Sequence, residues 1–449
     1  MQVEGQQESE ELKVYLPGMA LAEGEELEVD PSAYVMLHEL NAEWPCLSFD
    51  IVRDGGGEER TAFPMSGFLV TGSQADSRHK NMLYMLRCTN LRKTLQKLDD
   101  EANTDTEEEA DSDSEDDDDD EEGAEAQIGG KTDPRHYCLA IPHDGGVNRI
   151  RSINAIVDGA LRNVLTATWS DTGRVHVWDL QSAYSELAEI PLDSPSLFTR
   201  RQLKPIHAVT KHRTEGYALA WTASPGGFSL LSGDCDGQIM LTDAASERIS
   251  SSGEAFRGHT GSVEDLQWSP SENTVFASAS VDHTVRLWDI RLPHHQAALS
   301  AVVHDCDVNV LSWNRNATHM LATGADDGIF ATWDLRRWAP STEAVRAEPI
   351  LTSNWHQASI TSIEWSPHDA SVLAVAGADD QLSIWDFALD TADTEAEASQ
   401  PGDRQVPSQL LFIHQGQKEI KELHWHPQLS GVLVSTALSG FNIFKTISV

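Results

Sequence analysis

Residues 258–290 read "GHTGSVEDLQWSPSENTVFASASVDHTVRLWDI", and two later stretches repeat their pattern. These are "HDCDVNVLSWNRNATHMLATGADDGIFATWDL" (304–335) and "HQASITSIEWSPHDASVLAVAGADDQLSIWDF" (356–387). In each copy the leading histidine lies 29 residues before the tryptophan of a closing Trp-Asp pair: His259 and Trp288, His304 and Trp333, His356 and Trp385. A fixed period of this length indicates a repeat architecture in which each copy is one supersecondary unit.

Three weaker copies flank the clear ones. They begin near His143, His212 and His414 and close at "VHVWDL", "IMLTDA" and "FNIFK". Inside the copies apolar and polar residues alternate, as in "TVRLW", and Asp-Gly or Asp-Asp pairs separate the runs. Alternation of this kind predicts short antiparallel strands joined by tight turns.

Copies with four strands and a closing Trp-Asp pair resemble the WD-repeat β-propeller family over residues 143–449. The resemblance implies an all-β, seven-bladed propeller whose blades each contain a hydrogen-bonded chain of His, strand Ser or Thr, turn Asp and Trp. Two copies match in full: His259, Ser278, Asp282 and Trp288, then His304, Thr323, Asp327 and Trp333. Other copies depart from the pattern, with Thr242 in place of the Trp after Asp236, Val375 in place of the hydroxyl, and no turn Asp before Phe444.

The six copies leave one blade to find upstream. The runs 43–52, 67–76 and 81–91 are strand-like and predict a first blade without the Trp-Asp signature. We expect "CLSFDIV" (46–52) to pair with "NIFKTI" (442–447) and close the ring, which would remove exposed sheet edges. The spacing of "SAYVMLHEL" (32–40) predicts a short amphipathic helix.

A polyanion interrupts this pattern. Residues 99–125 hold 18 Asp and Glu and no Lys or Arg, in a chain of net charge −40. Such a stretch has almost nothing apolar to bury and predicts a disordered loop, here placed between the first and second blades. The predicted organisation is an acidic arm (1–30), a helix, closing strand and first blade (31–92), the acidic loop (93–135) and six further blades (136–449), with a second polar insertion at 390–408.

The tract is either a solubilising spacer or a binding segment for a strongly basic protein. Without its 18 acids the chain keeps 54 acids against 32 bases, so direct binding to a nucleic-acid backbone is disfavoured and a basic protein is the expected partner. The acids assigned to client binding are Glu107, Glu108, Glu109, Asp111, Asp113, Glu115, Asp116, Asp117, Asp118, Asp119, Asp120, Glu121 and Glu122. Thr106, Ser112 and Ser114 have acids three residues on, which fits kinases of the casein-kinase-two type and would add negative charge.

Catalytic and targeting signals are missing from the sequence. The five cysteines never form a CxxC pair, His424 and His426 lack a third metal ligand nearby, and no nucleophile-elbow, P-loop, GxGxxG or HExxH pattern occurs. The polar N-terminal stretch fits neither a signal nor a transit peptide, and no apolar run approaches the ~20 residues of a membrane helix. We therefore expect a soluble, non-enzymatic protein of the cytosol or nucleus, with no metal and no cofactor.

The block 14–54, which contains Glu-Trp-Pro-x-Leu, together with the acidic tract and the six copies resembles the glutamate-rich WD-repeat proteins. Members of that family are chaperones of ribosomal protein L three in large-subunit assembly, which implies a monomer in the nucleus and nucleolus with a cytoplasmic pool. The predicted helix followed by Glu-Trp-Pro also resembles histone-binding WD-repeat subunits of chromatin complexes. Histones are therefore a competing client.

Two further surfaces are predicted. Arg291 and Arg336 stand in Trp-Asp-x-Arg motifs, which resemble those of cullin-RING ubiquitin-ligase receptors, where this Arg contacts the adaptor on the bottom face. The alternative is that each Arg pairs with a neighbouring blade. Alignment on the strand tryptophans places Glu215, Asp307, Asp326 and Glu419 around the top of the channel, where they would receive a Lys- or Arg-rich segment; a chain this acidic could also expose such acids anywhere.

Overall fold

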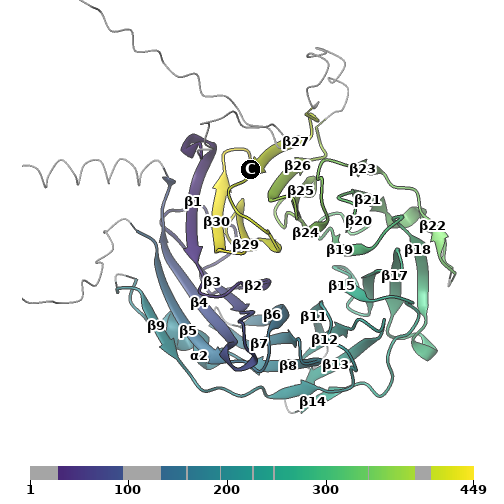
Figure 1. Cartoon of the computed structure of the whole chain (residues 1–449), viewed down its shortest axis with the longest axis horizontal. Helices are drawn as coiled ribbons and strands as arrows, with labels where there is room; N and C mark the ends of the chain where they lie inside the picture. Colours follow the sequence, from purple (N-terminus) through teal and green to yellow (C-terminus); the bar gives the residue numbers. More distant parts are fainter. Residues whose placement is uncertain are drawn as a thin grey trace, which may run out of the picture.

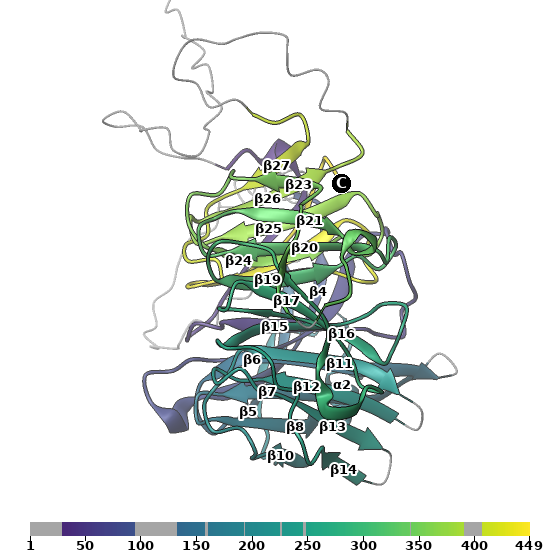
Figure 2. The same ribbon diagram turned by 90° about the vertical axis from the view of Figure 1, so that its right-hand side faces the viewer.

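The protein is a closed ring of seven β-sheets, seen down its axis in Figure 1 and edge-on in Figure 2. This computed structural model describes residues 29–94, 133–157, 160–192, 194–224, 227–245, 248–341, 343–389 and 406–449. Each sheet is one blade, and its first strand lies nearest the central channel. The predicted seven-bladed, all-β propeller is confirmed.

The first four blades follow one another along the chain. Blade 1 consists of β2 (Ser48–Val52), β3 (Met65–Gly72), β4 (Met82–Leu91), β5 (Arg135–Pro142) and β9 (Leu197–Arg200). Blade 2 consists of β6 (Val147–Val157), β7 (Ala160–Ser170), β8 (Arg174–Asp179) and β10 (His207–Val209). Blade 3 consists of β11 (Ala218–Ser224), β12 (Gly227–Gly233), β13 (Ile239–Ala245) and β14 (Arg248–Ser251). Blade 4 consists of β15 (Val263–Trp268), β16 (Val275–Ser280), β17 (Thr284–Asp289), β18 (Ala297–Val302) and β22 (Val345–Arg346).

The last three blades complete the ring. Blade 5 consists of β19 (Val308–Trp313), β20 (Met320–Ala325), β21 (Phe330–Asp334) and β23 (Leu351–Ser353). Blade 6 consists of β24 (Ile360–Trp365), β25 (Val372–Gly377), β26 (Gln381–Asp386) and β27 (Leu410–His414). Blade 7 consists of β28 (Glu422–Trp425), β29 (Val432–Ala437), β30 (Gly440–Thr446) and β1 (Tyr34–Asn41). The described helices are α2 (Gln181–Ala188) and four 3₁₀ turns, η1 (Pro31–Ala33), η2 (Arg78–Lys80), η3 (Pro293–His295) and η4 (Leu335–Arg337). None of them is long and apolar enough to span a bilayer.

The ring closes through β1, not through "CLSFDIV", so the sequence prediction of the closing strand was wrong. β1 pairs antiparallel with β30, from Tyr34 opposite Thr446 to Asn41 opposite Gly440, and Figure 1 shows the purple strand beside the yellow one. The predicted helix over 32–40 is wrong for the same reason. Burial alternates residue by residue, with Tyr34, Met36 and His38 inside, which is the two-residue period of a strand. The open edge of β30 supplies the backbone partners that favour a strand here.

The first blade extends past the acidic tract. β2, β3 and β4 confirm its three predicted strands, but β5 is the fourth, paired with β4 from Met82 opposite Pro142 to Thr89 opposite Arg135. The tract is therefore inserted within blade 1, between its third and fourth strands, and not between blades 1 and 2. The predicted boundary at residue 136 is wrong because β5 carries no repeat signature of its own.

The repeat histidines form the predicted hydrogen-bonded chains. His259 contacts Asp282 at 2.9 Å and Ser278 at 2.6 Å, and the Trp288 indole donates to the same Ser278 at 2.8 Å. His304, Thr323 and Trp333 are joined likewise, at 2.7 and 2.8 Å. Asp327 departs from the prediction, because it is exposed and accepts from the backbone N–H of Ile329 at 3.0 Å. Buried polar groups satisfied in this way stiffen each blade.

The blades that depart from the repeat pattern satisfy their histidines by other means. Ser383 of β26 lies opposite Val375 and contacts His356 at 2.8 Å, so the neighbouring strand supplies the hydroxyl that β25 lacks. In blade 7 the hydroxyl of Tyr34, from β1, contacts His414 at 2.7 Å. The closing strand therefore also completes the polar chain of the last blade.

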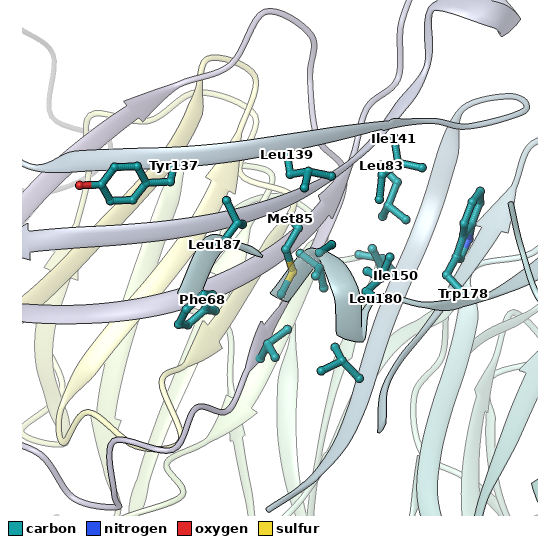
Figure 3. Close-up of a cluster of buried hydrophobic side chains, with 14 of the residues drawn as sticks. Phe68, Leu83, Met85, Tyr137, Leu139, Ile141, Ile150, Trp178, Leu180 and Leu187 are labelled. Atoms are coloured by element: carbon teal, nitrogen blue, oxygen red, sulfur yellow. The ribbon is translucent and has the colours of Figure 1, made fainter. Parts of the chain in front are cut away.

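Apolar side chains fill each contact between neighbouring blades. The described residues form seven buried clusters, one at each blade interface. Figure 3 shows the cluster between blades 1 and 2, where Met85, Ile150 and Trp178 meet. Leu187 of α2, a helix that the sequence analysis did not predict, packs onto this cluster, so the long connection after β8 is held against blade 1.

Candidate functional site

The strand order defines two faces of the ring. We call the top face the side on which the first strand of each blade begins and on which the turn between its second and third strands lies. The bottom face carries the connections from first to second and from third to fourth strands. Because β4 runs toward the bottom and β5 runs back, the connection 92–134 joins them on the bottom face.

The predicted client-binding acids of the tract, and the phosphorylation candidates Thr106, Ser112 and Ser114, lie outside the described residues. Their anchor points are defined. The side-chain amide of Asn90 donates to the carbonyl oxygen of Asp133 at 2.7 Å, which holds the two flanks of the tract together at the end of β4. Any load carried by the tract is thus transmitted to the edge of one rigid blade.

The bottom face carries all three long stretches that separate the described segments. β1 starts at this face, since Tyr34 lies opposite Thr446 at the bottom end of β30, so residues 1–28 precede it there. Residues 390–405 connect β26 to β27, again between third and fourth strands. The sequence analysis treated these segments as unrelated, because which face each joins depends on strand direction.

The four predicted acids of the dock lie at the top face, as expected, in loops of three blades. Glu215 precedes β11, Asp307 precedes β19, Asp326 follows β20 and Glu419 precedes β28. The carboxylates have local partners: Asn148 donates to Glu215 at 2.8 Å, Ser359 donates to Asp326 at 2.8 Å, and Lys421 lies 3.4 Å from Glu419. Asp307 and Glu419 keep exposed side chains, at 44% and 58%. We find the four acids spread around the mouth, not gathered in one cluster.

Sequence analysis missed Glu264, which belongs to the same mouth. Burial raises the pKa of Glu264, and the charges of Asp307 and Asp265 act in the same direction. Burial also raises the pKa of Tyr217, as do the nearby carboxylates of Glu215 and Glu264. Glu264 lies two residues after the loop position used for the alignment, so extending that alignment by one strand turn would have found it.

Polar side chains line the central channel below this mouth. The innermost strands present backbone N–H groups that have no further strand to pair with, and side chains from the preceding blade accept their hydrogen bonds. Examples are Ile150 N–H to Ser48 Oγ (3.0 Å), Leu311 N–H to Asp265 Oδ2 (3.0 Å), and Leu423 N–H to Ser362 Oγ (3.1 Å). The lining therefore cross-links consecutive blades and covers the inner sheet edges.

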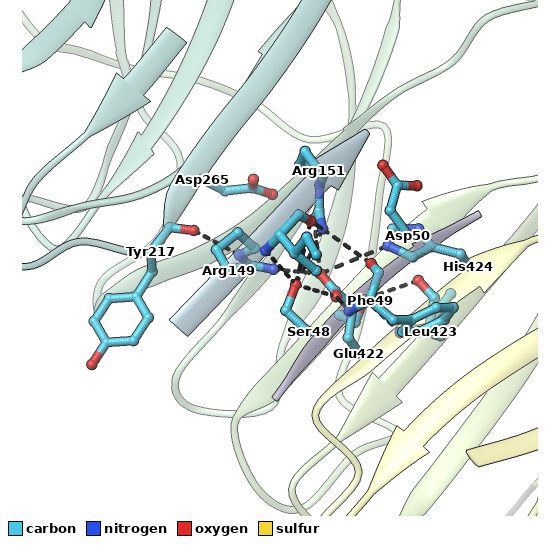
Figure 4. A network of polar contacts seen from close by, with 12 residues as sticks. Ser48, Phe49, Asp50, Arg149, Arg151, Tyr217, Asp265, Glu422, Leu423 and His424 are labelled. Carbon is cyan, nitrogen blue, oxygen red and sulfur yellow. Dashed lines mark hydrogen bonds and ion pairs between the residues drawn. The ribbon is translucent and has the colours of Figure 1, made fainter. Parts of the chain in front are cut away.

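Glu422 is the centre of this lining (Figure 4). Its side chain is fully buried, Oε1 lies 2.6 Å from Arg149 Nη1 and 2.8 Å from Arg151 Nη2, and Oε2 accepts from Ser48 Oγ at 2.7 Å and Phe49 N–H at 2.8 Å. Burial alone would raise the pKa of Glu422, but the two guanidinium groups hold it well below its usual value. One carboxylate thus joins blades 7, 1 and 2, where the ring closes.

The channel encloses a cavity of about 610 Å³, whose lining includes Asp50, Arg151, Asp265, Glu364 and His424. Burial raises the pKa of Asp50 and Asp265, yet each carboxylate accepts two backbone N–H groups. Within the described ranges no three His, Cys, Asp or Glu side chains are grouped to hold a metal. These charged groups are committed to backbone and ion-pair partners.

His424 gives this network a measurable pH dependence. Its ring lies 2.9 Å from Glu364 and 3.7 Å from Glu422. Burial alone would lower the pKa of His424, but the two carboxylates raise it to about 10. A raised folded-state pKa stabilises fully below the unfolded value of about 6.5, and this contribution is lost as pH rises toward 10.

We therefore expect the free energy of unfolding to fall more steeply between pH 7 and 10 in the parent protein than in a His424→Gln variant. One proton held only by the folded state corresponds to a difference of about 1.4 kcal/mol per pH unit. Urea denaturation at pH 7, 8, 9 and 10 measures both slopes. Equal slopes would show that His424 is not protonated in the folded protein.

Arg291 and Arg336 lie at the bottom face, as predicted, immediately after β17 and β21. Each guanidinium pairs at 2.7 Å with the Asp of its own Trp-Asp motif, Asp289 or Asp334. The side chains are 63% and 67% exposed. Neither of these ion pairs reaches another blade, so the alternative of pairing with a neighbouring blade does not account for them.

A closed seven-bladed ring with Trp-Asp strands, acid-rich connections and no assembled catalytic group among its described residues defines a WD-repeat β-propeller of the binding type. The family model described as WD domain, G-beta repeat matches residues 250–289 and 347–386. A second model, described as histone-binding protein RBBP4 or a component of the CAF1 complex, matches residues 24–92.

Full-length relatives make the assignment specific. Ribosome assembly protein rrb1 of Schizosaccharomyces pombe is 41% identical over 100% of this chain and 88% of its own length. Glutamate-rich WD repeat-containing protein 1 of Dictyostelium discoideum is 42% identical over 97% of this chain and 85% of its own. Protein HEAT STRESS TOLERANT DWD 1 of Arabidopsis thaliana is 43% identical over 97% and 92%. The chain belongs to the family of glutamate-rich WD-repeat proteins.

Proposed function

We propose that this protein is a non-catalytic escort of a basic protein in ribosome biogenesis, with ribosomal protein L three as its client. The observation that carries the proposal is the run of 18 acids at 99–125, whose two flanks are held together at the edge of a rigid ring by Asn90 and Asp133. A polyanion of this density screens a basic extension, and the ring supplies an ordered contact. The relative named as a ribosome assembly protein supports the process, and such a role places the protein in the nucleus and nucleolus, with a cytoplasmic pool.

The two client contacts act from opposite faces of the ring. The tract is anchored at the bottom and the acidic mouth opens at the top, so a client must be long enough to engage both. The undescribed segment 95–132 has 38 residues and can reach at most about 130 Å. Two weak contacts on one client raise the effective concentration of the second. Ribosomal RNA, a denser polyanion, then releases the client by competition.

Histones are the second candidate client, because the family model that matches residues 24–92 is described as histone-binding. Affinity purification at moderate salt separates the two. Ribosomal protein L three in near-equal amount supports the escort role. Core histones with chromatin subunits, and no ribosomal protein, support the alternative. A cullin and its adaptor as the dominant partners would assign the exposed Arg291 and Arg336 to a ligase role.

Charge reversal tests the top-face dock. Replacing Glu215, Asp307, Asp326 and Glu419 by lysine, with the tract intact, should weaken binding of ribosomal protein L three about tenfold or more, because like charges then meet at the mouth. Surface plasmon resonance should show slower association and faster dissociation. The control is lysine at four acids of 390–408, which should do little. If the control loses as much affinity, the attraction is global and the mouth is not the dock.

A further inference from the structure

The outer edge of blade 1 is an open strand that the client contacts do not use. β9 pairs in parallel with β5, from Tyr137 opposite Leu197 to Ala140 opposite Arg200, and forms the last strand of that sheet. Figure 1 shows β9 at the rim of the ring, away from the channel. We call residues 194–206, which contain β9, the strap. An edge strand of this kind offers unpaired backbone groups to another chain.

The strap is firmly attached. The hydroxyl of Tyr137 donates to the carbonyl oxygen of Ser194 at 2.8 Å, and the backbone N–H of Arg201 donates to the carbonyl oxygen of Ala140 at 2.9 Å. The N–H of His136 donates to Ser196 Oγ at 3.2 Å. These bonds hold the edge in an extended conformation before any partner binds, which lowers the entropy cost of binding.

Large apolar side chains of the strap remain in solvent. Leu197 is 46% exposed, Phe198 is 56% exposed and Ile206 is 51% exposed. Leu197 and Phe198 are adjacent in a strand, so their side chains project from opposite faces of the sheet. A strand added beside β9 could therefore bury apolar side chains on both faces.

The charge of the strap is opposite to that of the whole chain. Residues 194–206 contain Arg200, Arg201 and Lys204 and no Asp or Glu, in a protein of net charge −40. All three basic residues are exposed. Glu186 of α2 pairs with Arg201, and this carboxylate neutralises one of the three charges. An acidic segment is the charge complement of this edge.

We propose that the strap binds an extended, acidic and apolar segment of a partner protein, which adds to β9 as a sixth strand of blade 1. Backbone pairing supplies the geometry, Leu197 and Phe198 supply apolar contact, and the basic residues select for acid. This partner is distinct from the basic client, and the strap lies at the outer rim, so both can bind at once.

Other occupants fit the strap less well. A second copy of this chain would bring two sets of basic strap residues together, each carried by a body of net charge −40. The chain's own acids at 99–125 match the charge, but alanine is the only apolar residue type among them apart from one glycine. They cannot cover Phe198 and Leu197.

Selection from a displayed library of random 12-residue peptides on the full-length protein tests the proposal. We expect selected peptides in which Asp or Glu alternates with Val, Leu, Ile or Phe. Their affinity should fall at least tenfold on an Arg200→Glu/Arg201→Glu variant and on a separate Phe198→Ser variant. Both change exposed side chains, and circular dichroism checks their fold. Amide hydrogen exchange of β9 should slow when the best peptide binds.

Blade 4 provides the matched control, because β22 is likewise a fifth strand, paired in parallel with β18. Val345 is 52% exposed there, but Arg346 is already paired with Asp305. A Val345→Ser variant should bind the selected peptides as the parent does. The proposal is overturned by peptides that bind the strap variants unchanged, by a basic or absent selection, or by binding that appears only after residues 99–125 are deleted, which would assign the strap to the chain's own tract.

Discussion

Replacing Glu422 by alanine should lower the free energy of unfolding by about 3–5 kcal/mol, the cost of removing one partner from a buried ion pair. The variant would leave Arg149 and Arg151, whose side chains are only 13% and 19% exposed, facing each other without their shared carboxylate. It would also leave the N–H of Phe49 without its acceptor. Urea denaturation monitored by tryptophan fluorescence measures the change.

Two variants make this result specific to the buried charge. Glu422→Gln keeps the size of the side chain but not its charge, and should lose a smaller part of the stability. Glu419→Ala removes a carboxylate three residues away whose side chain is 58% exposed, and should change stability by less than about 0.5 kcal/mol. A loss below about 1 kcal/mol for Glu422→Ala would show that blades 7, 1 and 2 do not depend on this carboxylate.

Deleting residues 99–125 should slow association with the basic client about 10- to 100-fold at low salt, while the ring stays folded. Long-range attraction between a polyanion and a basic protein accelerates encounter by factors of this size and weakens as salt rises. The fold should persist, because Asn90 and Asp133 hold the two flanks together and the eleven remaining residues can join them. Stopped-flow association at 50 and 300 mM salt measures both effects.

The deletion has a control on the same face. Shortening the 390–405 connection removes five acids instead of 18 and should affect the association rate far less. Unfolding of the 99–125 deletion, or association at low salt that equals that of the parent, would contradict the proposed role. A residual affinity that no longer depends on salt is the expected signature of the ordered contact alone.

The repeat pattern was sufficient to predict the blades because it records local hydrogen bonds: His259 and Ser278 are 19 residues apart and belong to one sheet. The closing strand could not be predicted in this way. Tyr34 and Met36 have partners only at the far end of the chain, and nothing in their local sequence distinguishes an amphipathic helix from an edge strand of that kind. Likewise, β5 lacks the repeat signature, so the first blade appeared to end before the tract.

The candidate sites divide along the same line. Glu215, Asp307, Asp326 and Glu419 were found at the top face because each occupies a repeat position, which fixes its face. The role of Glu422 was not predicted, because its partners Arg149 and Ser48 come from two other blades. The strap was missed because β9 leaves its own blade and joins the sheet of the preceding one.

The pairing of β1 with β30 has a consequence for synthesis of the protein on the ribosome. Tyr34 is translated more than 400 residues before its partner Thr446, so the ring cannot close until translation is nearly complete. Until then the strand edge of β1 and the apolar side of blade 1 that faces blade 7 lack their cover. Contacts this distant in sequence form slowly, and unpaired strands aggregate. A nascent chain of this protein therefore has a long window in which it depends on cellular folding factors.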